Sequence, residues 1–220
     1  MSITTRGRFI VFEGIDASGK STQVNRLAEM VSAAGRKVHI TAEPTTGPIG
    51  SLIRQAFSGR TPLDDRVIAA LFVADRIDHL TNERDGILEL LGRGIDVISD
   101  RYYLSSVAYH SSDIDMNWVV RANELSTDLL LPDLTIYLDV APAVALRRLQ
   151  SRAQQTDKFE VFERLSAAHN NYERAIELLG TRDNIQVISA DGTLEEIAVE
   201  VQAVVNRSAG DVFQQAISTV

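Results

Sequence analysis

The 220-residue sequence contains no cysteine, which excludes disulfide bonds and metal sites built on thiolates. It contains no apolar run long enough to span a bilayer, and residues 1–6 lack the hydrophobic centre of a signal peptide. No internal repeat or low-complexity segment interrupts the chain. We therefore expect a cytoplasmic protein that does not bind membranes and that folds as one domain over residues 1–220.

Basic residues are in the minority. The sequence has 22 Lys and Arg residues against 30 Asp and Glu residues, which gives a formal net charge of −8. This balance argues against a broad nucleic-acid surface, although a single nucleotide can still bind where a few cations converge. The guanine-specific motif Asn-Lys-x-Asp is also missing, which argues against a GTPase.

Residues 14–21 fit the phosphate-binding loop pattern of Gly, four residues and Gly-Lys-Ser/Thr. The apolar run 9–12 predicts a buried strand before this loop. The pattern of residues 21–34 predicts a helix after the loop, and Gly35 is expected to end that helix. In such a loop the backbone N–H groups and the helix N-terminus hold phosphate, Lys20 reaches the β- and γ-phosphates, and Ser21 holds Mg²⁺. The predicted ATP-binding residues are Gly14, Ile15, Asp16, Ala17, Ser18, Gly19, Lys20, Ser21 and Thr22.

Strand and helix patterns alternate along the chain, which predicts an α/β fold with a five-stranded parallel sheet and helices on both faces. The expected strands are 9–12, 37–41, 95–99, 134–138 and 185–188. The expected helices are 21–34, 49–57, two within 62–91 that break near Asn82, one from about Ser105, and 117–131, 143–149, 161–179 and 194–206. Ligands of such sheets bind beyond the carboxyl ends of the strands.

Charged residues follow several predicted strands and should gather at that edge. Glu43 follows the second strand, Asp100 and Arg101 follow the third, and Asp139 follows the fourth. We expect Asp100 to lie near Mg²⁺ and its waters, and Arg101 to lie between the donor and acceptor phosphates. The alternative for this pair is a surface ion pair at a strand end.

Phe72 and Arg76 are four residues apart on one face of a predicted helix. One interpretation is that the ring stacks on a base while the guanidinium binds a phosphate. The other places Phe72 in the core with Arg76 reaching out to solvent. Ser105 and Tyr109 share the same spacing and could bond a base edge, although Ser and Tyr are common at such positions.

Basic residues surround the polar segment after the fourth strand, namely Arg147, Arg148, Arg152 and Lys158. A mobile cation there could stabilise the charge that develops during phosphoryl transfer. The alternative is a solvated basic helix end, which the helix dipole favours.

Four stretches in order resemble the thymidylate kinase family of nucleoside monophosphate kinases: Phe12–Asp16 with Gly19–Thr22, Leu71–Arg76, Asp100–Tyr102 and Pro132–Val140. The resemblance covers about residues 7–207. It implies a P-loop kinase fold with a short lid at about 150–160, and transfer of the ATP γ-phosphate to dTMP with Mg²⁺ in a homodimer. The tail 208–220 has no counterpart.

The resemblance also implies site residues. Phe72 would stack on thymine, Arg76 would hold the acceptor phosphate, and Asp16 would meet the sugar 3′-hydroxyl. The expected dTMP-binding set is Asp16, Glu43, Phe72, Arg76, Arg101, Ser105 and Tyr109, and the expected metal-binding residues are Ser21 and Asp100. The phosphate loop has no arginine of its own, so the expected catalytic residues are Lys20, Arg101 and the lid residue Arg152.

Three positions depart from the family pattern. Ala42 stands where bacterial members place an arginine, His110 stands where an amide is common, and Gln150 stands where a further arginine is expected. Two rival functions stay open on the residues alone. A deoxynucleoside kinase would share the phosphate loop but would not need Arg76 beside Phe72, and a non-catalytic nucleotide-binding module would not need Lys20 and Asp100.

Overall fold

The computed structural model describes residues 6–151 and 158–208. Its centre is a five-stranded sheet with the order β2-β3-β1-β4-β5, in which every neighbouring pair is parallel. The strands are β1 (Phe9–Glu13), β2 (Val38–Ala42), β3 (Asp96–Asp100), β4 (Leu134–Asp139) and β5 (Ile185–Ser189). The predicted α/β class and all five predicted strands are confirmed.

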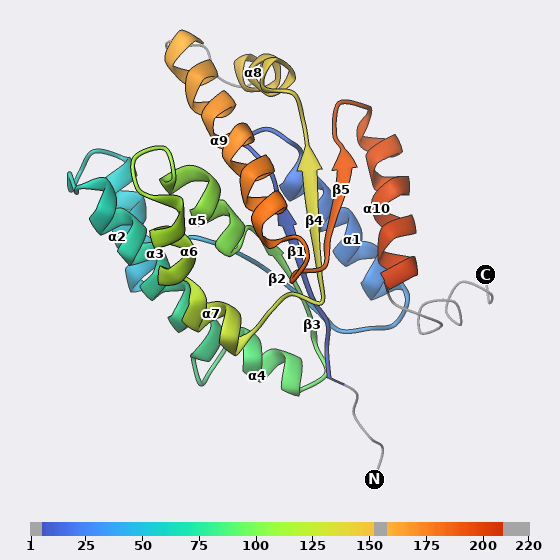
Figure 1. The fold of residues 1–220 in the computed structure, drawn as a ribbon. Coiled ribbons are helices and arrows are strands. Elements are labelled where there is room, and N and C mark those ends of the chain that lie inside the picture. Colours follow the sequence, from blue (N-terminus) through green and yellow to red (C-terminus); the bar gives the residue numbers. More distant parts are fainter. Residues whose placement is uncertain (1–5, 152–157, 209–220) are drawn as a thin grey trace.

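Ten helices connect or follow these strands in the described residues: α1 (Lys20–Ala33), α2 (Pro48–Phe57), α3 (Asp65–Thr81), α4 (Ile87–Gly92), α5 (Tyr103–His110), α6 (Met116–Ala122), α7 (Glu124–Leu129), α8 (Pro142–Gln150), α9 (Lys158–Leu179) and α10 (Leu194–Ser208). They cover both faces of the sheet, with α1 and α10 packed together on one face and α5 and α9 on the other (Figure 1). None of the described helices is long and apolar enough to cross a membrane.

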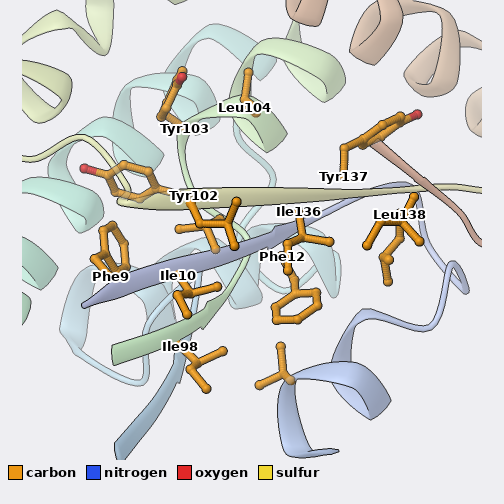
Figure 2. Packing of buried hydrophobic residues seen from close by; sticks show 14 of the residues in the cluster. Phe9, Ile10, Phe12, Ile98, Tyr102, Tyr103, Leu104, Ile136, Tyr137 and Leu138 are labelled. Atoms are coloured by element: carbon orange, nitrogen blue, oxygen red, sulfur yellow. The ribbon is translucent and has the colours of Figure 1, made fainter. Parts of the chain in front are cut away.

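The core lies on both sides of β1, whose five residues are all buried. Aromatic and aliphatic side chains from β1, β3 and β4 meet those of α5 there (Figure 2). Phe9 and Tyr102 pack edge to face with ring centroids 5.2 Å apart, and Tyr103 packs in the same way against Tyr102 at 5.5 Å. Strand β1 and the start of α5 therefore form a rigid base for the loops above them.

The strand order places the site. Strand β1 lies between β3 and β4, and the chain forms β2 and β3 on one side of β1 before it crosses to form β4 and β5 on the other. Such a switch point opens a crevice beyond the carboxyl ends of the strands. The loops after β1 and β2 and the residues Asp100 and Arg101 share that edge.

The predicted helix 117–131 is wrong in one respect, because the chain forms two helices that meet at Asn123. The Asn123 side chain is buried, and its amide donates to the Val119 carbonyl at 2.8 Å while its oxygen accepts from Arg76. A polar side chain that bonds the backbone in this way competes with regular helix hydrogen bonds. Most of the expected lid, 152–157, and of the tail, 209–220, lies outside the described residues.

Candidate active site

The loop from Gly14 to Lys20 closes tightly over the end of β1. Gly14 and Gly19 have φ of 146° and 101°, and Ala17 also has a positive φ of 63°. A Cβ on Gly14 would lie 2.7 Å from the Leu138 carbonyl oxygen, so only glycine fits between β1 and β4 there. The sequence thus folds into the compact loop that presents backbone N–H groups to an anion.

Lys20 begins α1 and is buried under this loop. Its ammonium donates to the carbonyl oxygens of Gly14 and Ile15 at 2.9 and 3.0 Å. Burial, followed by the nearby charge of Arg101, lowers the pKa of Lys20 to about 8. Lys20 is therefore still mostly protonated at neutral pH and lies within the loop, as the motif predicts.

Ser21 and Asp100 come together across the sheet edge. The Ser21 hydroxyl donates to Asp100 Oδ2 at 2.6 Å. The other carboxylate oxygen, Oδ1, is buried and has no hydrogen-bond partner among the described residues. The two predicted metal-binding residues thus offer hard oxygen atoms side by side, of the kind that Mg²⁺ prefers.

Arg101 points from the end of β3 across the loop. Its φ is 80°, an uncommon conformation for a residue other than glycine, and Ser99 Oγ donates to its carbonyl oxygen at 2.7 Å. Its guanidinium donates to Asp16 Oδ1 at 2.6 Å, to Ser105 Oγ at 3.0 Å and to the Tyr109 hydroxyl at 3.3 Å. Four residues of the predicted acceptor site are therefore in contact with one another.

A buried carboxylate lies beneath this group. Glu13 accepts from the Ser105 hydroxyl at 2.5 Å, from the Tyr172 hydroxyl at 2.8 Å and from the Tyr102 backbone N–H at 2.8 Å. Burial raises the pKa of Glu13, although these bonds and the charge of Arg101 oppose the shift. Glu13 and Tyr172 were not among the predicted site residues. The position of Glu13, an acidic residue at the end of an otherwise apolar strand, indicates a buried functional carboxylate. No local pattern in the sequence indicates a role for Tyr172.

Arg76 is completely buried, and it does not reach out to solvent as one interpretation expected. Its Nε donates to Glu43 Oε2 at 2.8 Å, and further bonds go to Asn123, Ser106 Oγ and the Tyr102 carbonyl. Although burial alone would raise it, the pKa of Glu43 is lowered by the charge of Arg76 and by His79. Glu43 is the anionic partner of this buried arginine, and the predicted contact of Arg76 with a phosphate stays a prediction.

Phe72 lies one turn before Arg76 on α3 and is only partly buried. Its ring packs near His110 and Phe57, with centroids 5.2 and 6.1 Å away. Burial, followed by the charge of Arg76, lowers the pKa of His110 to about 4. A neutral imidazole has one donor and one acceptor, and the amide expected at this position also combines donor and acceptor groups.

The basic residues after β4 lie in different environments. Arg148 donates to the Ala17 carbonyl at 3.4 Å and to the Ala190 carbonyl at 2.9 Å, so it joins α8 to the phosphate loop and to the end of β5. Arg147 is exposed. Arg152 lies outside the described residues, and its predicted catalytic role stays a prediction. Arg54 of α2 donates to the Pro44 carbonyl at 3.0 Å, and thus places a cation on the loop that follows Ala42.

A cavity of about 240 Å³ opens over the phosphate loop. Its lining consists of Asp16, Ala17, Gly19, Lys20, Ser21, Thr22, Asp100 and Arg101. A larger cavity of about 640 Å³ runs beside β2 and shares Ser21 and Asp100 with it. The phosphate loop, the buried ammonium of Lys20 and the carboxylate of Asp100 converge on the smaller cavity.

Comparison with known proteins agrees with this geometry. The sequence profile described as thymidylate kinase matches residues 12–201. A probable thymidylate kinase of Pyrobaculum calidifontis is 38% identical over 203 residues, which cover 91% of this chain and 96% of the relative. A probable thymidylate kinase of Pyrococcus horikoshii is 35% identical over 206 residues with the same coverage, 91% and 96%. The thymidylate kinase of Leptospira borgpetersenii is 35% identical over 168 residues, 76% of this chain and 80% of the relative. With the phosphate loop, Asp100 and Arg101 all in place within the matched region, the chain belongs to the thymidylate kinase family.

Proposed function

We propose that this protein transfers the γ-phosphoryl group of ATP to the 5′-phosphate of dTMP, giving dTDP and ADP. The observation that carries the proposal is the position of Arg101. Its guanidinium lies in the same cavity as Lys20, while it also bonds Asp16, Ser105 and Tyr109 of the predicted acceptor site. A cation in this position faces the donor phosphates on one side and an acceptor on the other.

The donor phosphates bind over the phosphate loop. Lys20 exchanges its bonds to the Gly14 and Ile15 carbonyls for bonds to the β- and γ-phosphates, and the backbone N–H groups at the start of α1 hold the remaining oxygens. The buried position of Lys20 strengthens its attraction to the transferred charge, because little water screens it. Arg152 adds a second cation from the lid once ATP is bound.

Ser21 and Asp100 fit Mg²⁺. Both offer oxygen ligands, Ser21 Oγ lies 2.6 Å from Asp100 Oδ2, and the buried Asp100 Oδ1 has no hydrogen-bond partner in the described parts of the chain. The ion, when bound, neutralises charge on the β- and γ-phosphates. Asp100 itself is anchored as the last residue of β3, so it holds its position without the phosphates.

The acceptor binds between α3 and α5. Phe72 stacks on the thymine ring and the neutral His110 beside it supplies a donor and an acceptor to the base edge. Asp16 meets the sugar 3′-hydroxyl, and Arg101 orients the attacking phosphate toward the γ-phosphorus. Tyr172 and Glu13 fix Ser105 below the sugar, and Ser105 in turn bonds Arg101.

We further propose a homodimer in the cytoplasm. Helices α3 and α7 lie side by side and expose apolar residues, including Val67, Leu125 and Leu129 at 45%, 55% and 38% of their surface. The small residues Ala70 and Ala74 are exposed on α3 as well, so another helix can approach closely there. Sedimentation equilibrium should give twice the chain mass, and Leu125→Asp should shift the species toward a monomer.

The test of the activity is an ATP-consumption assay over a panel of nucleosides and nucleoside monophosphates. We expect the highest kcat/KM with dTMP, less with dUMP, and no consumption in the Lys20→Ala variant. Robust turnover by folded Lys20→Ala would contradict the proposal, and so would a clear preference for a purine monophosphate.

A further inference from the structure

The end of β2 and the loop that follows it are joined to α3 by three polar contacts. Alternate residues of this segment each bond a different polar residue of α3. The pairs are Thr41 Oγ1 with His79 Nε2 at 2.7 Å, Glu43 Oε2 with Arg76 Nε at 2.8 Å, and Thr45 N with Asp75 Oδ2 at 2.7 Å. The C-terminal half of the helix that carries Phe72 is thus joined to the end of β2 and to the loop that carries Glu43.

The contact at Asp75 is the most complete of the three. Asp75 is 1% exposed, and both of its carboxylate oxygens accept from Thr45. The Thr45 hydroxyl donates to Oδ1 at 2.6 Å, and it also accepts from the Gly47 backbone N–H at 3.1 Å. Hydrogen bonds to a buried carboxylate are stronger than neutral ones, so this pair holds the loop firmly.

Thr45 is also the point at which α2 rests on the loop. A Cβ on Gly50 would lie 2.0 Å from the Thr45 carbonyl oxygen and 2.7 Å from its nitrogen, so the first turn of α2 touches the Thr45 backbone. The Arg54 guanidinium donates to the same carbonyl oxygen. A shift of Thr45 would therefore move α2, the loop and Glu43 together.

We propose that Asp75 and Thr45 are positioning residues of the acceptor site. Neither lines the cavity over the phosphate loop, and Thr45 lines only the larger cavity beside β2. They act through their neighbours, because the Asp75–Thr45 pair sets the distance between Glu43 on the loop and Phe72 and Arg76 on α3. The inference rests on the proposed function, in which Phe72 stacks on the base, and on the predicted acceptor set, which also includes Glu43 and Arg76.

The test compares two substitutions of one residue. Thr45→Val keeps the shape of the side chain but removes the hydroxyl, and Thr45→Ser keeps the hydroxyl. The matched control is Thr81→Val, which removes an exposed hydroxyl that bonds only the Ile77 carbonyl on the same helix. Steady-state KM for the acceptor and for ATP, kcat and the melting temperature are measured for each. The acceptor is the monophosphate that the wild-type protein prefers in the panel, so failure of the dTMP assignment is seen separately in the wild type.

We expect Thr45→Val to raise KM for the acceptor by about tenfold or more, since a hydrogen bond to a charged group is lost. KM for ATP and kcat should stay within about twofold, and Thr45→Ser should restore most of the acceptor KM. The inference is overturned if folded Thr45→Val behaves like Thr81→Val, or if both KM values rise together, or if Thr45→Ser is as impaired as Thr45→Val. If Thr45→Val does not fold, Asp75→Asn takes its place, and KM for the acceptor should again rise while KM for ATP stays within about twofold.

Discussion

The hydroxyl of Ser21 lies 2.6 Å from Oδ2 of Asp100, although the two residues are 79 positions apart in the chain. This contact joins the start of α1 to the end of β3 and leaves Asp100 Oδ1 without a partner in the described part of the chain. It places two side-chain oxygen atoms at the edge of the cavity that Lys20 also lines.

Replacement of Asp100 tests the metal site. Asp100→Asn should lower kcat by about tenfold or more and raise the Mg²⁺ concentration needed for half-maximal rate, because an amide binds Mg²⁺ more weakly than a carboxylate does. The exposed Asp128→Asn should leave the Mg²⁺ dependence unchanged. A Mg²⁺ titration of Asp100→Asn that coincides with the wild type would show that Asp100 has no part in metal binding.

The titration of Lys20 should make the catalytic rate depend on pH. Burial lowers its pKa to about 8, so deprotonation removes its charge as the pH rises through 8. The protonated form binds phosphate, and kcat/KM for ATP should therefore fall about tenfold per pH unit above this value. A Lys20→Arg variant with measurable turnover should lack this alkaline fall, since a guanidinium stays protonated. An alkaline fall that is identical in both proteins would assign it to another group.

Phe72→Ala and Arg76→Ala should both weaken acceptor binding but should differ in their effect on stability. Phe72→Ala should weaken acceptor binding by about 1–3 kcal/mol, the usual worth of stacking on a base, with little change in stability. Arg76→Ala should weaken acceptor binding at least as much, and should also lower the free energy of unfolding by about 3–5 kcal/mol, because the buried Glu43 loses its arginine partner and keeps only the contact with His79. Neither should change ATP affinity. Calorimetric titration with each nucleotide and urea unfolding separate the two; equal stability losses would contradict this account of Arg76.

Arg152 is expected to act mainly in the transition state. Arg152→Ala should lower kcat by about a hundredfold or more with little change in ATP affinity, because the charge it stabilises develops only during transfer. The exposed Arg121→Ala is the matched control. Single-turnover kinetics and ATP titration provide the measurement, and a variant that loses only ATP affinity would identify Arg152 as a simple binding residue.

Local patterns in the sequence account for much of the fold and of the donor site. The phosphate loop is contiguous, so its glycines, Lys20 and Ser21 could be identified from spacing alone. Parallel strands place their carboxyl ends at one edge, so the approach of Asp100 and Arg101 to this loop could also be predicted. The central strands β1, β3 and β4 could be predicted because buried strands form short, mostly apolar runs between helical patterns.

Contacts between distant segments could not be predicted in the same way. The sequence shows that Arg76 needs an anionic partner, but only the fold brings Glu43 to it from 33 residues away. The break between α6 and α7 depends on the tertiary contact of Asn123 with Arg76, which overrides a helical pattern. Tyr172 reaches Glu13 across 159 positions, a distance at which periodicity carries no information.

The most direct test of the central claim is the ratio of kcat/KM for dTMP to that for thymidine, measured with the same enzyme, ATP and Mg²⁺, with the product identified by ³¹P NMR. The account predicts dTDP from dTMP and no detectable product from thymidine, because thymidine has no phosphate to meet Arg101 and the γ-phosphoryl group. Phosphorylation of thymidine as fast as that of dTMP would contradict it and would identify a nucleoside kinase instead.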